Sequence, residues 1–527
     1  MPHTRPLGAQ ISHMLKDRGV DVIFGIPGVH NQEMYRGIEE AGITHVLARH
    51  EQGAGFMADG YARASGRPGV AYVITGPGLC NIMTPMGQAY SDSVPMLVIS
   101  SCLDETAAKR GQLHQMKDQR AAAATVCDWS EEARTAEAAY ALVDRALREM
   151  DTDRPRPKHI QVPIAQLEAA APPFVAGGLI AGNSAAPEAQ MREVAALLAT
   201  SKRPLLVLGG GTTQASDQVR AFLGKCPAAV FTSYAGRGVV APSYGLLFGS
   251  TLARPDSANV LAEADLVIAV GTELAQVDLW RDRLGHTAPL IRVDIDTEVL
   301  SNSSDAHLRI QCDAARFFEA VTAKINGAQT VWDPAAVAAR RARWRSEIDA
   351  ERTGIVPVCD ALRACLPDGT MIYSDMTQLA YAAKEVWDMD QPGHWHHPYG
   401  FGTLGYAIPA AIGGGVARKG LPTMAIIGDY GFHYTMQELG VAVELGLPLP
   451  ILLWDNGKLG EIEDSMVRAQ IAPNAVIAHN PDFCKLAEAF GAQSAAPQSL
   501  HDMQAAVRTA FDADGPTLIY VTPDISR

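Results

Sequence analysis

Two polar residues, Asp429 and Asn456, each stand directly after an apolar stretch and could bind a metal ion together. The apolar stretches are 424–427 and 451–454, and one amphipathic stretch, 435–445, lies between them. A strand–helix–strand unit with a right-handed crossover has parallel strands, so both residues would meet at one edge of a sheet. Mg²⁺ accepts carboxylate and amide oxygens, and phosphate oxygens and water complete its octahedron. The spacing therefore predicts a site for magnesium and a phosphate group.

Two glycines, Gly428 and Gly431, flank Asp429 and would let backbone amides approach a phosphate closely. Asp and Asn are also common in caps and turns, and for either residue alone that structural role is the better interpretation. Their positions at the ends of two strands joined by one helix reverse that preference.

A third candidate, Glu51, begins a stretch of mostly small residues that reads as a helix, 51–63. Small residues let helices pack closely, and such packing could lie between subunits. A glutamate buried in these surroundings would favour its protonated form. The alternative is a surface glutamate in a first helical turn, stabilised by the helix dipole. Beside the metal motif, we interpret Glu51 as a functional carboxyl.

These motifs resemble those of the thiamine-diphosphate-dependent enzymes, especially the group of acetolactate synthase and pyruvate decarboxylase. The family pattern is Gly-Asp-Gly followed by Asn-Asn, and the resemblance extends over essentially the whole chain. It implies thiamine diphosphate and Mg²⁺ as cofactors. It also implies Asp429, Asn456 and the backbone carbonyl of Lys458 as metal ligands. Glu51 would share a proton with the pyrimidine N1′ of the cofactor.

The chain departs from the family pattern at two positions. Tyr430 stands where a small residue is usual, and Asp455 replaces the first Asn of the pair. Because the second Asn is the family's metal ligand and is kept as Asn456, the metal site should persist. Asp455 would either add negative charge near the metal or turn away from it.

The resemblance also implies how the protein holds the rest of the cofactor. Leu404 would be the apolar wedge that bends it, and the carbonyl of Gly402 would accept a hydrogen bond from its 4′-amino group. A glycine-rich turn with a core leucine is compatible with both roles. The residues expected to bind the cofactor are Glu51, Gly402, Leu404, Gly428, Asp429, Tyr430, Gly431 and Asn456.

On the substrate side, Thr75 and Gly76 lie in a segment similar to the loop that faces the thiazolium ring in acetolactate synthases. Some related decarboxylases carry a catalytic histidine there, and this chain has Thr75 instead. His114 is therefore the better candidate for a catalytic polar group near the substrate, although a lone histidine is more often structural. Glu461 and Asp464 follow the second metal motif at a spacing that places them on one helix face. An acidic pocket there would favour a substrate with a cationic tail.

The pattern of segments 111–114 and 428–432 looks closer to decarboxylases of 5-guanidino-2-oxopentanoate, which we favour as the activity. The alternatives are an acetolactate-synthase-like carboligase, another 2-oxo acid lyase or acyltransferase, and a degenerate non-catalytic subunit. The last requires loss of Glu51 or Asp429, and both are present. Acetolactate synthases carry an Arg-rich stretch that helps to hold FAD, where this chain has 271–277 without arginine. We therefore expect no bound FAD.

Three segments of the chain alternate short apolar runs with amphipathic stretches, which is typical of parallel sheets covered by helices. The sequence predicts an α/β protein of three consecutive doubly wound domains: a pyrimidine-binding domain at 1–170, a central domain at 186–330 and a diphosphate-binding domain at 350–527. A linker is expected at 169–187. The predicted strands are 22–24, 70–75, 96–100, 204–208, 266–270, 290–295, 371–374, 423–427, 451–454 and 517–521.

The composition bounds the partners of the protein. A formal net charge of -14 argues against nucleic-acid binding. Eight scattered cysteines without close pairs suit reduced thiols, and no stretch reads as a signal peptide or membrane span. We expect a cytoplasmic enzyme that acts on a small 2-oxo acid. The resemblance implies a homodimer at minimum, because the family joins its first and third segments from different subunits, and we expect a homotetramer.

Overall fold

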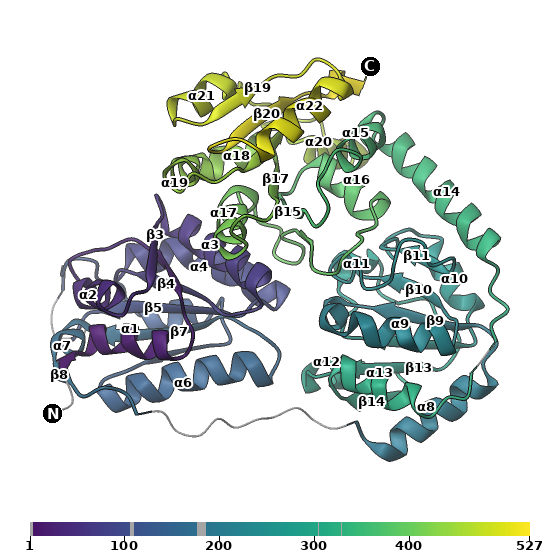
Figure 1. Ribbon diagram of the computed structural model, residues 1–527, viewed down its shortest axis with the longest axis horizontal. Helices are drawn as coiled ribbons and strands as arrows, with labels where there is room; N and C mark the ends of the chain where they lie inside the picture. Colours follow the sequence, from purple (N-terminus) through teal and green to yellow (C-terminus); the bar gives the residue numbers. More distant parts are fainter. Residues whose placement is uncertain (1–3, 106–109, 176–185, 304, 328, 527) are drawn as a thin grey trace. The chain divides into compact units, whose positions relative to one another are not determined.

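The computed structural model describes residues 4–105, 110–175, 186–303, 305–327 and 329–526 (Figure 1). It contains three six-stranded sheets, each with helices, and a two-stranded ribbon of β1 (Arg5–Pro6) and β8 (Ala170–Ala171). The prediction of an α/β fold with three such sheets is confirmed. Contacts group the residues into two compact units: 1–180, 372–377 and 397–522 form the first, and 181–371, 378–396 and 523–527 the second.

The first sheet has the order β3-β2-β4-β5-β7-β6, and all neighbouring strands are parallel. Its central strands are apolar and buried on both faces, as parallel sheets between helices require. The strands are β2 (Val22–Gly25), β3 (Thr44–Leu47), β4 (Gly69–Val73), β5 (Met96–Cys102), β6 (Trp129–Glu132) and β7 (Lys158–Pro163). The helices are α1 (Leu7–Asp17), α2 (Gln32–Glu40), α3 (Glu51–Ser65), α4 (Pro77–Asp92), α5 (Gln119–Ala123), α6 (Ala136–Thr152) and α7 (Ile164–Glu168).

The second sheet, in the second unit, has the order β11-β10-β9-β12-β13-β14 and is also parallel throughout. Two separate apolar clusters cover its two faces, which is the arrangement of a doubly wound sheet. The strands are β9 (Pro204–Leu208), β10 (Ala229–Thr232), β11 (Leu247–Gly249), β12 (Leu266–Val270), β13 (Leu290–Asp294) and β14 (Leu308–Gln311). The main helices are α8 (Glu188–Thr200), α9 (Ser216–Lys225), α10 (Ser257–Glu263), α13 (Ala314–Thr322) and α14 (Pro334–Glu351).

The third sheet has the order β16-β15-β17-β18-β20-β19. Its strands are β15 (Met371–Ser374), β16 (Trp395–His396), β17 (Thr423–Gly428), β18 (Pro450–Trp454), β19 (Gln493–Ala495) and β20 (Thr517–Val521). The accompanying helices are α15 (Ile355–Arg363), α16 (Gln378–Val386), α17 (Ala407–Ala417), α18 (Asp429–Thr435), α19 (Leu439–Glu444), α20 (Gly460–Arg468), α21 (Phe483–Ala489) and α22 (Leu500–Phe511).

The predicted strands agree with these bounds to within two residues. Within the linker expected at 169–187, however, Ala170–Ala171 form strand β8, and the segment between β17 and β18 also differs from the prediction. The single amphipathic stretch expected at 435–445 is divided into the end of α18, a 3-10 turn at Met436–Glu438, and α19. Of the predicted linker, residues 176–185 lie outside the described residues, and the domain boundaries stay a prediction. Among the described residues, no helix is long and apolar enough to cross a membrane.

Candidate active site

The predicted metal ligands lie at the carboxyl ends of neighbouring parallel strands. β17 and β18 pair in register, with Gly428 opposite Trp454. Asp429 begins α18 immediately after β17, and Asn456 follows β18 after one intervening residue. The expected strand–helix–strand geometry is therefore present, at the sheet edge where open α/β folds bind ligands.

Asn480, which the sequence analysis missed, joins the two acidic groups at this edge. Its Nδ2 donates to Asp429 Oδ2 at 2.8 Å and to Asp455 Oδ1 at 2.9 Å. The other carboxylate oxygen of Asp455 accepts a hydrogen bond from the Tyr520 hydroxyl at 2.9 Å. Asp455 therefore faces the site and does not turn away from it. Nothing in the sequence around Asn480 beyond the turn-forming Asn-Pro pair signals this contact.

The electrostatics of the two carboxylates suit the binding of a divalent cation. Burial raises the pKa of Asp429, the negative charge of Asp455 raises it further, and the hydrogen bond from Asn480 opposes both effects. Asp429 is only 3% exposed. A divalent ion would stabilise two adjacent carboxylates in such buried surroundings. Among the described residues, no three His, Cys, Asp or Glu side chains form a metal cluster.

The turn after β18 carries the other two predicted ligands. The backbone amide of Lys458 donates to Asn456 Oδ1 at 3.2 Å, and the amide of Gly457 donates to Asp455 Oδ1 at 2.8 Å. The ammonium of Lys458 pairs with Glu463 on α20. These bonds fix a compact turn at 455–458 and hold α20 next to it.

Glu51 is the first residue of α3 and is 8% exposed. Its Oε2 accepts a hydrogen bond from Asn81 Nδ2 of α4 at 2.9 Å. A Cβ built on Gly78 would lie 3.4 Å from Glu51 Oε1, so the carboxylate reaches the first turn of α4. The preceding residue, His50, caps the helix by accepting from the amide of Gln52 at 3.1 Å. The expectation of a buried glutamate is met, and the surface alternative is not.

A second buried glutamate, Glu438 of the 3-10 turn Met436–Glu438, contacts the segment at the start of α3. The sequence analysis did not predict it. It is fully buried, and both of its carboxylate oxygens accept from the backbone amide of Arg49, at 3.0 and 3.2 Å. The pKa of Glu438 is raised to about 7. Burial is the main cause of the rise and the negative charge of Glu51 adds to it, while the hydrogen bonds from the backbone amides of Arg49 and His50 oppose it. Glu438 thus ties the 3-10 turn after α18 to the helix that carries Glu51.

Helix α3 packs along α17 at backbone distance. A Cβ on Gly60 would lie 1.9 Å from the carbonyl oxygen of Ala410, and one on Gly413 would lie 1.9 Å from that of Met57. Only glycine permits this approach at both positions. The close packing expected from the small residues of α3 is confirmed, and the partner helix belongs to the same chain.

A buried polar network holds the loop before α17. Asp59 of α3 accepts from Arg63 Nε and from the Tyr406 hydroxyl, both at 2.7 Å. Arg63 also donates to Asp92 Oδ2 at 2.9 Å, and Asp92 Oδ1 accepts from the amide of Gly400 at 3.0 Å. The network anchors both ends of the loop 400–406.

That loop contains two of the predicted cofactor residues, Gly402 and Leu404. Gly402 has a φ of +67°, a conformation that favours glycine, and Leu404 is half-buried. At the end of the loop, buried Asp375 accepts from the amide of Ala407 at 3.3 Å, and burial raises its pKa to about 6. A Cβ on Gly431 would lie 3.0 Å from the Asp375 carboxyl, so α18 approaches this group closely.

At the carboxyl edge of the first sheet, Thr75 and Gly76 are held by side chains from β5 and α5. The Thr75 hydroxyl lies 2.8 Å from that of Ser101, and Gln119 Oε1 accepts from the amide of Gly76 at 2.9 Å. The carbonyl of His114 packs on Gly76, where a Cβ would collide with it. His114 itself has a φ of +63°, a backbone conformation that residues other than glycine rarely adopt. The structure thus brings Thr75, Gly76 and His114 together.

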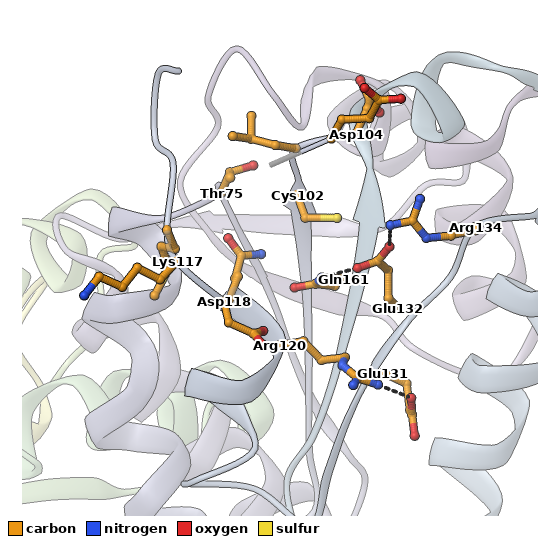
Figure 2. A pocket seen from close by; sticks show the side chains of 14 residues that line it. Thr75, Cys102, Asp104, Lys117, Asp118, Arg120, Glu131, Glu132, Arg134 and Gln161 are labelled. Carbon is orange, nitrogen blue, oxygen red and sulfur yellow. Dashed lines mark hydrogen bonds and ion pairs between the residues drawn. The ribbon is translucent and has the colours of Figure 1, made fainter. Parts of the chain in front are cut away.

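A cavity of about 810 Å³ extends from Thr75 across the ends of β5, β6 and β7. Figure 2 shows its lining side chains. Two ion pairs lie in this lining: Arg134 binds Glu132, and Arg120 lies 3.4 Å from Glu131. Gln161 Nε2 also donates to Glu132 at 2.6 Å. The lining residues are Thr75, Cys102, Leu103, Asp104, Glu105, Met116, Lys117, Asp118, Gln119, Arg120, Glu131, Glu132, Arg134 and Gln161.

Glu461 and Asp464 both lie on α20, as their spacing predicted. Glu461 is half-buried and stands in the first turn of the helix, whereas Asp464 is exposed. Since α20 follows directly after the 455–458 turn, Glu461 is the carboxylate of this pair that lies nearer to the metal motif along the chain.

Comparisons with known proteins agree with this geometry. Three family models match: the N-terminal TPP binding domain of thiamine pyrophosphate enzymes at residues 5–122, their central domain at 191–321 and their C-terminal TPP binding domain at 375–521. The chain is 42% identical over 525 residues to a probable 2-ketoarginine decarboxylase of Pseudomonas aeruginosa, covering 98% of this chain and 94% of the relative.

Other relatives are acetolactate synthases. The large subunits of isozymes 1 and 2 from Escherichia coli are 28% and 29% identical to this chain, each covering 98% of it and 93% and 95% of the relative. The matches span all three sheets and include the segments that carry Glu51, Asp429 and Asn456. The chain therefore belongs to the thiamine-diphosphate-dependent enzymes, in the group of the 2-oxo acid decarboxylases and acetolactate synthases.

Proposed function

We propose that this protein catalyses the non-oxidative decarboxylation of a 2-oxo acid with a guanidino tail, 5-guanidino-2-oxopentanoate, using thiamine diphosphate and Mg²⁺. The observation that supports the proposal is the in-register pairing of β17 and β18, because Asp429 and Asn456 follow these two neighbouring strands at one sheet edge. The near full-length similarity to a probable 2-ketoarginine decarboxylase supports the choice of substrate.

In this proposal the chain holds the cofactor at two sheet edges. Asp429, Asn456 and the carbonyl of Lys458 would hold Mg²⁺, which would bring positive charge to the diphosphate. The neighbouring carboxylates of Asp429 and Asp455, joined by Asn480, support this fit. Gly428 at the end of β17 and the N-terminus of α18 offer backbone amides to the phosphates. The segment Gly402–Leu404, held by the Asp59–Asp92 network, supports the rings.

Bound thiamine diphosphate supplies the carbon nucleophile and the electron sink for loss of carbon dioxide. The protein contributes proton transfers and orientation. Glu51, buried and oriented by Asn81, exchanges a proton with the pyrimidine N1′. Thr75, Gly76 and His114 line the approach to the reacting carbon, and the Ser101 and Gln119 side chains hold that loop in place.

The acidic character of the site supports a cationic substrate tail. Glu461 lies in the first turn of α20, shortly after the turn at 455–458, with Asp464 three residues further along. A carboxylate can receive two parallel hydrogen bonds from a guanidinium. In this proposal Glu461 makes that pair and Asp464 adds charge at the rim.

An acetolactate-synthase-like carboligation is the second candidate, because two acetolactate synthases match over 98% of the chain. The two reactions share every step up to loss of carbon dioxide and differ in whether a proton or a second carbonyl compound captures the reacting carbon.

One experiment separates the candidates. Protein stripped of cofactor and metal is incubated with a panel of 2-oxo acids, with thiamine diphosphate and Mg²⁺ added singly and together, and products are scored as aldehyde or acyloin. We expect aldehyde from 5-guanidino-2-oxopentanoate only when both are added. Full turnover without either addition would refute the cofactor proposal, and acyloin as the main product would favour carboligation.

We propose that the enzyme is a homotetramer built from dimers, in which Glu51 of one subunit serves a site completed by the diphosphate-binding segment of another. The matches to both terminal binding domains of the family support this assembly. Solution scattering should report a particle of two or four chains, and a fully active monomer would refute it.

A further inference from the structure

The cavity at the carboxyl edge of the first sheet is lined by the buried side chain of Gln161. This residue of β7 is 5% exposed, and its Oε1 atom has no hydrogen-bond partner among the described residues. Its Nε2 atom donates to Glu132 on β6, and because a carboxylate only accepts, this bond fixes which end of the amide is oxygen. Buried amide oxygens are normally satisfied, so a ligand with N–H donors would complete this site.

The neighbouring carboxylate already binds a guanidinium. Arg134 forms an ion pair with Glu132, and Figure 2 shows Gln161, Glu132 and Arg134 joined in a row. The side chain of Arg134 is 68% exposed, whereas that of Glu132 is 22% exposed. Exposed ion pairs contribute little to stability. A guanidinium that enters the cavity can therefore take the place of Arg134 at small cost and reach Gln161 as well.

The rest of the lining suits an alkyl chain that carries one positive charge. Cys102, Leu103 and Met116 contribute apolar side chains. Burial raises the pKa of the Cys102 thiol and the charge of Glu132 adds to the rise, so this thiol stays uncharged. Acidic residues outnumber basic ones in the lining by five to three. The cavity therefore favours a cation over an anion and offers methylene groups a surface on which to pack.

One end of the cavity lies at Thr75, in the loop that the proposed function places beside the reacting carbon. Because the sheet order is β4-β5-β7-β6, Gln161 lies two strand spacings from the strand that leads into this loop, about 10 Å. In 5-guanidino-2-oxopentanoate six bonds separate the 2-oxo carbon from a terminal nitrogen, about 7 Å when extended, and a hydrogen bond adds about 3 Å. The tail of the proposed substrate thus matches the distance from the loop to Gln161.

We propose that Glu132 and Gln161 form a subsite that recognises the guanidino tail of the substrate. Glu132 accepts from the guanidinium in place of Arg134, and Gln161 Oε1 accepts from one of the remaining N–H groups. A guanidinium has five N–H donors, enough for these acceptors and for the pair that the proposed function gives to Glu461. The inference rests on the proposed function and adds the residues of the first sheet that distinguish a cationic tail from a neutral one.

The subsite is tested first without turnover. The probe is 5-guanidinopentanoate, which has the same tail and no 2-oxo group, and its binding to the cofactor-free full-length protein is measured by calorimetry. Glu132→Gln keeps the shape of the side chain but removes its charge, so affinity should fall about 10–100-fold, the range of a charged hydrogen bond. Arg134→Met removes the competing guanidinium, so affinity should rise about 2–5-fold. No binding to the wild type, equal affinity in Glu132→Gln, or no gain in Arg134→Met would overturn the subsite.

The second test is kinetic and compares two substrates. In 2-oxo-5-ureidopentanoate an uncharged urea group of nearly the same shape replaces the guanidinium. Glu132→Gln should lower kcat/KM for the guanidino acid about 10–100-fold and leave kcat/KM for the ureido acid almost unchanged. The probe should inhibit turnover of the guanidino acid competitively. Equal losses on both substrates, or non-competitive inhibition by the probe, would overturn the subsite.

The two tests together separate the subsite from the proposed function. If the guanidino acid is turned over and Glu132→Gln has no effect, the subsite alone is refuted. If the probe binds through Glu132 and the guanidino acid is not turned over, the proposed function alone is refuted.

Glu137 offers a matched control. It is an exposed residue in the first turn of α6, shortly after Arg134, and lies outside the lining of the cavity. Glu137→Gln makes the same chemical change as Glu132→Gln, and it should leave the affinity for the probe and both kcat/KM values at the wild-type level. A loss equal to that of Glu132→Gln would show an effect of net charge alone and would overturn the assignment of Glu132.

Discussion

Replacing Gly413 by alanine should force α17 away from α3. The added Cβ would lie 1.9 Å from the Met57 carbonyl oxygen, whereas ordinary Cβ contacts begin at 3.4 Å, so the helices must separate by the difference, about 1.5 Å. Overpacking of this kind costs about 1–3 kcal/mol, against about 0.5–1 kcal/mol gained when alanine replaces a helical glycine. Because the same interface supports Glu51 and the 400–406 loop, turnover should fall as well.

Gly415 on the same helix provides the control. A Cβ there would meet only the Leu447 methyl groups, at 3.6 and 3.7 Å. Gly415→Ala should therefore stabilise the protein by about 0.5–1 kcal/mol, the intrinsic helix preference alone. The two variants carry the same chemical change on one helix and differ in what the methyl group meets.

The assay is thermal unfolding of the cofactor-free proteins, compared by midpoint because a chain of 527 residues need not unfold in two states. Each kcal/mol corresponds to about 2–4 °C for a large domain. We expect Gly413→Ala to unfold below the wild type and Gly415→Ala above it. Equal midpoints for the two variants would refute the close approach of α3 and α17.

The remaining predictions concern three glutamates. The Glu51→Gln variant should still bind thiamine diphosphate, but the C2 proton of the bound cofactor should exchange with solvent far more slowly. An unchanged exchange rate would show that Glu51 has a structural role. Glu438 has a raised pKa in the folded state, so its contribution to stability is complete below about pH 4.5 and is lost as the pH rises through about 7. Glu438→Gln should remove on the order of 3 kcal/mol of the change in unfolding free energy across that pH window. It should therefore flatten the plot of unfolding midpoint against pH, and a curve parallel to the wild type would contradict the assignment. Glu461→Gln should lower kcat/KM for the guanidino 2-oxo acid by an amount equivalent to about 1.5–3 kcal/mol, and it should barely change kcat/KM for pyruvate. Equal losses with both substrates would exclude a role of Glu461 in recognising the cationic tail.

The sequence predicted the features that repeat along the chain. Strands such as Leu266–Val270 are buried on both faces and appear as unbroken apolar runs, so their positions were predicted almost to the residue. Asp429 and Asn456 were predicted because parallel neighbours bring the ends of consecutive strands together. Both arguments use local pattern and chain topology alone.

The contacts that sequence could not supply join loops far apart in the chain. Asn480 meets Asp429 across 51 positions, and Glu438 meets Arg49 across 389. Such contacts depend on where each loop ends in space, which is set by helix packing and has no periodic signature.

The amide of Asn480 has a consequence for the stability of this sheet edge. By donating to Asp429 and Asp455 at once, it opposes the repulsion between two carboxylates at one sheet edge. Asn480→Leu, which removes both hydrogen bonds, would leave that repulsion unopposed. One neutral amide thus lets the chain keep two neighbouring acidic groups at this edge, and its loss should cost stability that an added divalent cation restores.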